Sequence, residues 1–310
     1  MGSPATSAQF VKLLVDDLTE VSEFRYKELD EGLVEKFYRQ MDSQKAQEEF
    51  YGIGDMPDIP EFSGELEYLS RAPGYSTKIE PQEFAGGTML ERKLIDDKRY
   101  PVMEAKTMGL MEAAARVKEK KAVHPFAYMF SSAFDFMKSE EGVALCSSSH
   151  TTKADGVSTS DGFDNAGTSA MTKGSVAATR ILMRQFRSDI GERINVSDNL
   201  ALVGPDELAD TMDEIVGTPK GLYSGEGTKN VAYGRYKPMP ILRLSDYDTN
   251  DWAMVDLDMM KKCLIWINRI MPPELTNTRD FDTYVLKFAL YMRFANGFTD
   301  WRWIYGHSVT

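Results

Sequence analysis

The stretch from Leu145 to Gly217 constrains the fold more than any other part of the chain. It begins as a loop rich in Gly, Ser, Thr and Asp that reaches Asp164-Asn165. The spacing of apolar residues then predicts a helix over 172–190, and the apolar run Leu200–Val203 predicts a buried strand. A Gly-Pro-Asp turn leads into a second predicted helix over 208–215. This order is an α/β unit, and no catalytic motif is visible in it.

The first helix of this unit has an apolar face and a basic face. Val176, Thr179, Met183, Phe186 and Ile190 share one side of a helical wheel, and Arg180, Arg184 and Arg187 share another. Thr168 or Ser169 is the expected N-cap, because a short hydroxyl side chain there accepts from an unpaired backbone N–H.

The strongest helical pattern of the chain runs from Pro101 to about Ala122. Proline is favourable in the first turn, because the N–H that it lacks would have no helical partner. Basic residues near position 120 suit the negative end of the helix dipole. Pro125 is expected to end the helix, and the aromatic stretch after it is expected to enter the core.

A long β-hairpin is predicted between Glu65 and Leu94. Two strand-like runs flank a polar bend at Glu80–Glu83, and Gly74 gives the freedom that a twisted hairpin needs. These runs have little apolar surface to bury. We therefore expect the hairpin to project from the body and to pack on something else.

The sequence predicts the structure of the two ends of the chain less clearly. Residues 10–41 have helical spacing with heavily charged faces, so this arm either covers a core or lies on another subunit. Near the other end, Ile265–Ile270 predicts a strand that stops before Pro272-Pro273. Alternation predicts further strands at Leu286–Leu290 and Trp301–Trp303.

Composition indicates a globular protein without a membrane span or secretory signal. The 310 residues are 42% hydrophobic and 27% charged, and no apolar run approaches the ~20 residues that a spanning helix needs. Two distant cysteines do not suggest a disulfide framework. A net charge of −12 argues against gripping nucleic acid through a general basic surface.

Candidate catalytic and metal-binding residues are weak in every case. Cys146 and His150 have the spacing of a nucleophile with its base or of two zinc ligands, but no second Cys/His pair supports them. The loop aspartates lack calcium-loop spacing, and the glycines of 221–227 lack a phosphate-binding motif. We interpret the remaining acidic cluster as a solvated edge (Asp246, Asp248, Asp251, Asp256 and Asp258). The prediction is therefore no catalytic residue, no cofactor and no metal, which favours assembly over catalysis.

The succession of short motifs resembles a known family. The order of these motifs is similar to that in the major capsid proteins of tailed bacteriophages, which have the Hong Kong 97-like fold. The motifs are, in chain order, Ser147-Ser148-Ser149-His150, Asp164–Thr168, Asp189-Ile190-Gly191, Leu202–Leu208 and Asp300–Gly306. The pattern is most similar to the Mu-like head subunit. The resemblance covers nearly the whole chain, and its specificity comes from the order of the motifs.

The resemblance implies an α+β fold of five segments. These are an N-terminal arm at 1–50, an extended loop with its base at 51–92, a peripheral domain with a spine helix at 93–146, an axial domain at 147–263, and a return to the peripheral domain at 264–310. It implies a non-enzymatic protein that assembles as hexamers and pentamers into the icosahedral head of a double-stranded DNA phage. The implied location is the virion, with assembly in the cytoplasm of the host bacterium.

Implied partners are further copies of the chain, a portal protein, decoration proteins, and packaged DNA as a non-specific neighbour. The arm begins almost at Met1, which leaves no room for an attached scaffolding segment, so a separate scaffolding protein is expected. Some relatives cross-link subunits through a loop lysine. Lys78 lies in this loop, but no matching Asn and Glu can be placed, so no cross-link is expected.

Two alternatives stay open at this stage. An encapsulin-like compartment of the same fold would hold an enzyme cargo, and neighbouring genes would distinguish it. A cytosolic hydrolase would use Cys146 and His150, and loss of turnover in Cys146→Ala would reveal it.

Overall fold

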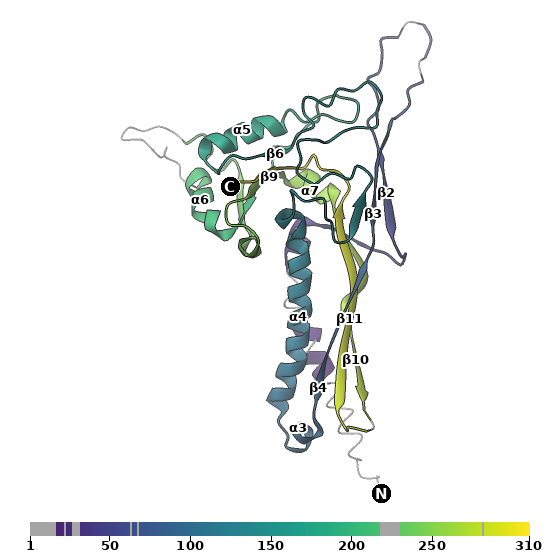
Figure 1. Cartoon of the computed structure of the whole chain (residues 1–310), viewed down its shortest axis with the longest axis vertical. Helices are drawn as coiled ribbons and strands as arrows, with labels where there is room; N and C mark the ends of the chain where they lie inside the picture. The colour runs from purple at the N-terminus through teal and green to yellow at the C-terminus, as the bar shows by residue number, and fades with distance from the viewer. Residues whose placement is uncertain are drawn as a thin grey trace, which may run out of the picture.

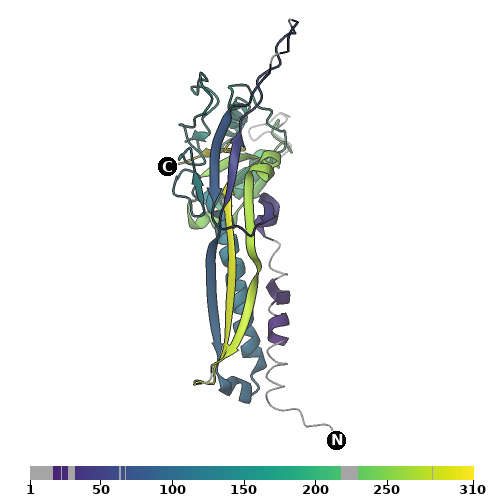
Figure 2. The same cartoon turned by 90° about the vertical axis from the view of Figure 1, so that its right-hand side faces the viewer.

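The computed structural model describes most of the chain, namely residues 17–21, 23–26, 32–62, 64–66, 68–217, 230–280 and 282–310. A tall lobe is built along helix α4, and a second lobe sits at its upper end (Figure 1). A long loop projects beyond the second lobe, and the view at right angles shows that the whole molecule is thin (Figure 2).

The tall, peripheral lobe consists of one long helix and one sheet. Helix α4 (Tyr100–Ala127) buries a residue at nearly every turn, among them Met103, Met111, Ala114 and Ala122. A four-stranded sheet in the order β1-β10-β11-β4 runs alongside it (Figure 1). Its strands are β1 (Arg39–Asp42), β10 (Leu264–Arg279), β11 (Leu286–Phe298) and β4 (Gln82–Leu90). Short helices α2 (Leu33–Phe37) and α3 (Arg92–Asp96) flank α4.

The predicted spine helix is present, but Pro125 does not end it. Proline at 125 lies inside the last turn and has no N–H to give to the carbonyl of Lys121. The side-chain amide of Asn296, from β11, donates to that carbonyl at 2.5 Å. The Tyr38 hydroxyl donates to the next carbonyl, that of Ala122, at 2.7 Å. Contacts from distant segments thus let the helix continue to Ala127.

The predicted hairpin with a bend at Glu80–Glu83 is wrong. Strand β3 (Pro73–Ile79) pairs with β2 (Glu48–Ile53) and with β5 (Met137–Ser139), whereas β4 pairs with β11. The bend therefore carries one extended chain from one sheet into another. The real hairpin is β2–β3, and residues 54–72 form its projecting loop (Figure 1). A Cβ at Gly74 would come within 2.9 Å of the Gly52 carbonyl carbon, so glycine permits the close approach of the two strands.

Two predictions for the C-terminal strands are also wrong. Strand β10 passes through Pro272-Pro273, because the ladder with β11 shifts register between Ile270 and Glu274 and needs no N–H there. Trp301–Trp303 forms a bend and turn, and the strand begins only at Ile304. The strand at Leu286–Leu290 is confirmed as the start of β11.

The second, axial lobe contains a five-stranded sheet in the order β6-β12-β9-β7-β8. These strands are β6 (Ala166–Gly167), β12 (Ile304–His307), β9 (Trp252–Asp256), β7 (Leu200–Gly204) and β8 (Lys237–Pro240). Every residue of β7 and β9 is buried, as the apolar run Leu200–Val203 predicts. Residues 264–310 therefore do not all return to the peripheral lobe, because β12 belongs to this sheet. The other predicted domain boundaries stay a prediction.

Helices surround the axial sheet. They are α5 (Lys173–Met183), α6 (Ala209–Val216) and α7 (Leu257–Cys263), with the 3₁₀ turns η1 (Asp206–Leu208) and η2 (Leu242–Asp246). The N-cap of α5 is Thr172, not Thr168 or Ser169, because Thr172 and Ser175 cap one another reciprocally. This helix ends at Met183 instead of Ile190, since residues 186–194 fold back and place Phe186 against Trp301.

The described part of the N-terminal arm packs against the peripheral lobe of the same chain. Residues 17–21 and 23–26 are helical, and Leu18 packs with Leu90, Met103 and Phe288 in a small cluster. The helical prediction fails at Met41, which lies in β1 and pairs with Ile267. Residues 1–16 and 27–31 lie outside the described residues. No described helix is long and apolar enough to cross a bilayer.

Candidate assembly surfaces

The projecting loop of the β2–β3 hairpin carries most of its apolar side chains in the open. Ile59 is 89% exposed and Tyr68 is 94% exposed. Others on the same loop and its adjoining strand are also exposed: Tyr51, Ile53, Met56, Phe62 and Leu66. A contiguous group of exposed large apolar residues usually marks an interaction site.

The base of this hairpin is held by a charged network. The Glu140 carboxylate accepts hydrogen bonds from the backbone N–H of Ser76 at 2.9 Å and from its hydroxyl at 3.0 Å, and it pairs with the Lys153 ammonium. The hydrogen bonds from Lys153 and Ser76 lower the pKa of Glu140 to about 2. Tyr75 adds a hydrogen bond to Thr151 at 2.7 Å. These contacts fix the direction in which the hairpin leaves the body.

Lys78 lies on this hairpin and forms an ion pair within it. Its ammonium is 3.3 Å from a carboxylate oxygen of Glu49 on the neighbouring strand. The absence of a covalent cross-link stays a prediction.

The Cys146 and His150 pair does not have the geometry of a nucleophile and its base. The Cys146 sulfur lies against Gly306, and burial raises the pKa of this thiol far above its usual range. The His150 ring stacks on Trp301 at 4.2 Å, and its Nδ1 is 3.1 Å from the Glu141 carboxylate. A thiol that stays protonated is a poor nucleophile. Both residues serve the packing between the Ser-rich loop and the C-terminal segment.

The acidic clusters also have structural roles. The interpretation as a solvated edge is wrong for Asp256, which is fully buried, accepts from the backbone and the hydroxyl of Ser197 at 2.7 and 2.8 Å, and caps α7. Asp248 accepts from the backbone N–H groups of Asn250 and Asp251. Among the described residues, no group of three or more His, Cys, Asp or Glu side chains is arranged to hold a metal ion. Residues 221–227 lie outside the described part of the chain.

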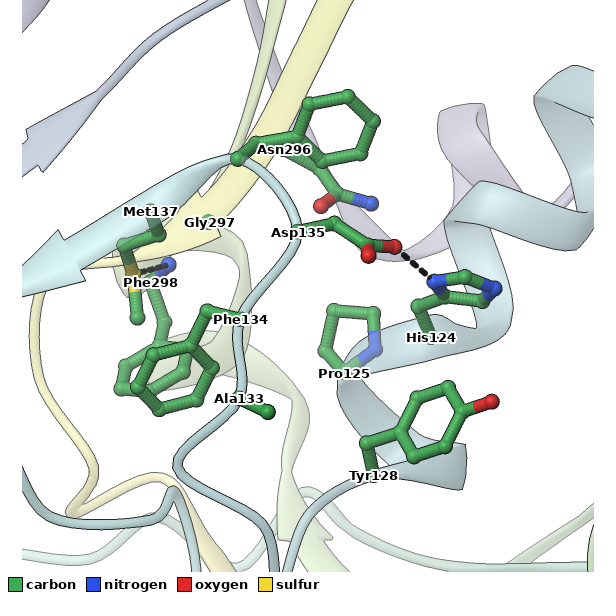
Figure 3. A pocket seen from close by; sticks show the side chains of 11 residues that line it. His124, Pro125, Tyr128, Ala133, Phe134, Asp135, Met137, Asn296, Gly297 and Phe298 are labelled. Carbon is green, nitrogen blue, oxygen red and sulfur yellow. Dashed lines mark hydrogen bonds and ion pairs between the residues drawn. The ribbon is translucent and has the colours of Figure 1, made fainter.

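A small pocket lies where α4 meets the end of β11 (Figure 3). His124 and Asp135 face each other across it and form a hydrogen bond, while Lys121 pairs with the same carboxylate at 2.7 Å. Burial and the Lys121 charge lower the pKa of His124. The rest of the lining is mainly apolar and includes Phe134, Phe136 and Phe298, with no Ser, Thr or Cys nucleophile. The contacts of Asp135 with Lys121 and His124 therefore anchor the 131–136 loop to the end of α4.

Comparison with known proteins decides the family. Residues 74–306 match the family model of a phage capsid protein. The chain belongs to this phage capsid protein family. It is accordingly a structural protein of the virion. No curated protein matches the chain.

Solved capsid chains have the same fold at very low sequence identity. A chain of Mycobacterium phage Patience is 10% identical, with a TM-score of 0.59 over 98% of this chain and 90% of that one. A chain of the bacteriophage PhiM1 mature capsid is 9% identical, with a TM-score of 0.56 over 90% and 87%. A chain of the Ralstonia phage GP4 capsid is 10% identical, with a TM-score of 0.54 over 88% and 86%. The predicted Hong Kong 97-like α+β fold is confirmed, while the Mu-like subtype stays a prediction.

The resemblance implied an extended loop within 51–92, but the hairpin predicted from the residues had its bend at Glu80–Glu83, so sequence reasoning missed the loop that projects and its exposed residues. The turn-rich stretch 54–72 contains Ile59, Phe62, Leu66 and Tyr68, which is a large apolar content for a loop. That content was the available signal, because a loop that contacts only water needs no such side chains.

Proposed function

We propose that this capsid protein is the major subunit of an icosahedral phage head and that it assembles as hexamers and pentamers. The exposed apolar loop of the β2–β3 hairpin carries the proposal. Its side chains cannot be covered by the body of their own chain, because the hairpin points away from it (Figure 1). A neighbouring copy of the same chain would cover them.

The energetics favour such a contact. Removing apolar surface from water gives about 25 cal/mol per Å², and a fully buried Phe or Ile side chain gives about 1.5–3 kcal/mol. Several such side chains on one loop therefore stabilise a subunit contact by several kcal/mol in gross terms. The Glu140–Ser76–Lys153 network holds the hairpin in a defined direction, so less orientational freedom is lost when the loop binds.

The remaining expectations belong to the same proposal. The head encloses double-stranded DNA, and the chain assembles in the bacterial cytoplasm with a separate scaffolding protein, a portal protein and decoration proteins as partners. The protein has no enzymatic activity. The buried, protonated thiol of Cys146 argues against the alternative hydrolase, and the family match favours a phage head over an encapsulin-like compartment.

Charged substitutions on the loop test the proposal. In the double variant Ile59→Asp/Tyr68→Asp, two exposed apolar side chains become charged without any loss of buried contacts. Electron microscopy and sedimentation are expected to show no shells or rings, while the unfolding midpoint of the subunit stays at its original value. The matched control Asn195→Asp/Asn277→Asp adds the same charge at exposed polar positions and is expected to assemble.

Two outcomes would contradict the proposal. If the unaltered chain stays a monomer or dimer, alone and with its scaffolding protein, then it is not a self-assembling shell subunit. If the loop variant assembles as well as the control, then the loop is not an assembly surface.

A further inference from the structure

One edge of the axial lobe is acidic. Five acidic side chains of η1 and α6 are exposed, and residues 206–217 contain no basic residue (Asp206, Glu207, Asp210, Asp213 and Glu214). The apolar side of α6 is buried, so the acidic side faces outward. The adjoining turn η2 is tied to this edge through Ser245, which donates to Glu207 at 2.6 Å. In the same turn Leu242 is 72% exposed, and Arg243 pairs with Glu119 of α4. We call the surface of η1, α6 and η2 the acidic edge.

A second edge, on α5, is its chemical complement. The exposed side of α5 carries a strip of small and apolar residues, Ala177, Ala178, Ile181 and Leu182. Ile181 is 51% exposed. Lys173, Arg180 and Arg184 flank the strip, and residues 172–188 contain no acidic side chain, although Arg184 pairs with Asp198 of the same chain. We call this surface the basic edge.

The two edges lie on different helices of the axial lobe. Helix α5 packs on β12 and β9, whereas α6 packs on β8 at the end of the sheet. Figure 1 shows α5 along the top of the axial lobe and α6 at its left-hand end, below one end of α5. The exposed sides of both helices are open to contact with a second copy.

We propose that the basic edge of one subunit packs against the acidic edge of the next one around the capsomer. This inference rests on the proposed assembly into rings. A symmetric contact of two acidic edges would place ten carboxylates together, and a contact of two basic edges would place like charges together. The head-to-tail arrangement instead pairs opposite charges, and a head-to-tail contact repeats from copy to copy and forms a ring where the rotation between copies closes.

Paired cysteines test the arrangement directly. The double variant Ile181→Cys/Leu242→Cys places one thiol on each edge of every chain. After oxidation of purified assemblies, a non-reducing gel is expected to show a ladder that reaches five and six chains. Each single variant is expected to give no ladder, and dimers from Ile181→Cys alone would overturn the proposal because they join two basic edges. The control Ile181→Cys/Met89→Cys moves the second exposed thiol to β4 of the peripheral sheet and is expected to give no ladder.

Charge reversal provides a second test that does not depend on thiol geometry. Asp210→Lys/Asp213→Lys is expected to lower the yield of assemblies by about tenfold or more, because it brings cations against cations. Adding Lys173→Glu/Gln185→Glu in the same chain, which keeps the Arg184–Asp198 pair, is expected to restore assembly. Unchanged yield in the first variant, or no restoration in the combined one, would overturn the proposed edge contact.

The two proposals fail in different ways. If the unaltered chain forms shells or rings but shows neither the ladder nor the charge effect, then the edge contact is wrong and the capsid assembly stands. If the unaltered chain forms no assembly of any kind, then both proposals are wrong.

Discussion

Asn165 joins three segments of the chain through one fully buried amide. Its Oδ1 accepts from the Ser147 backbone N–H at 2.7 Å, and its Nδ2 donates to the carbonyls of Leu145 at 2.8 Å and Ile304 at 3.1 Å. The side chain has no exposed surface. Asn165→Ala removes all three hydrogen bonds and leaves backbone groups in a space closed to solvent.

The expected cost follows from these partners. A buried polar group that loses its partner costs about 1–3 kcal/mol. With one N–H and two carbonyls affected, we expect Asn165→Ala to lower the free energy of unfolding by about 3–5 kcal/mol. This is a large share of the about 5–15 kcal/mol that folded domains have. Asn165→Asp is expected to be similarly costly, because it puts an oxygen opposite the carbonyls of Leu145 and Ile304.

The measurement is urea unfolding of the unassembled subunit, followed by tryptophan fluorescence. Assembly must be avoided, because association stabilises the folded state by mass action. Asn195→Ala is the control, since Asn195 is exposed, and it is expected to change stability by no more than about 0.5 kcal/mol. A loss below about 1 kcal/mol in Asn165→Ala would refute the reasoning that these hydrogen bonds hold the segments together.

Three further predictions concern packing, pH and DNA. Gly306→Ala is expected to cost about 1–3 kcal/mol by overpacking, because its Cβ would lie 2.8 Å from the Cys146 sulfur, whereas Gly174→Ala, whose Cβ would lie 3.9 Å from the Thr172 hydroxyl oxygen, is expected to be tolerated in the same unfolding assay. Burial lowers the pKa of His307 from 6.5 to about 4, so the unfolded chain binds this proton first and stability is expected to fall as the pH drops from 6.5 towards 4. His307→Gln is expected to flatten that part of the stability profile. With a net charge of −12, the isolated subunit is expected to bind duplex DNA more weakly than about 10⁻⁴ M at physiological salt, and tighter binding in a fluorescence titration would contradict the expectation that this chain does not grip nucleic acid.

The sequence predicted those elements whose signal is local. Leu200–Val203 is apolar at every position, so a strand buried on both faces was the simplest interpretation, and β7 confirms it. The long helix was equally evident from its spacing. Its extension past Pro125 was not, because the group that compensates for the missing N–H is Asn296, 171 residues further along the chain, as the numbering shows.

Strand partners were the main failure for the same physical reason. Residues 82–90 read as the return strand of a local hairpin, yet they pair with β11, about two hundred residues away. Period-two alternation indicates a strand but does not identify its partner. The candidate surface was missed for this reason, because the projecting hairpin was predicted at 65–94 and the exposure of Ile59 and Tyr68 depends on the pairing of β2 with β3.

Stability and assembly depend on different residues of this capsid protein. The interior is complete without any neighbour, since Trp252, Trp266 and Trp303 are fully buried within the chain. The exposed apolar residues of the hairpin loop are therefore not the remainder of an unfinished core. We therefore expect that charging Ile59 and Tyr68 abolishes assembly and leaves the unfolding free energy of the subunit unchanged, whereas Asn165→Ala is expected to lower that free energy even where no neighbour is present.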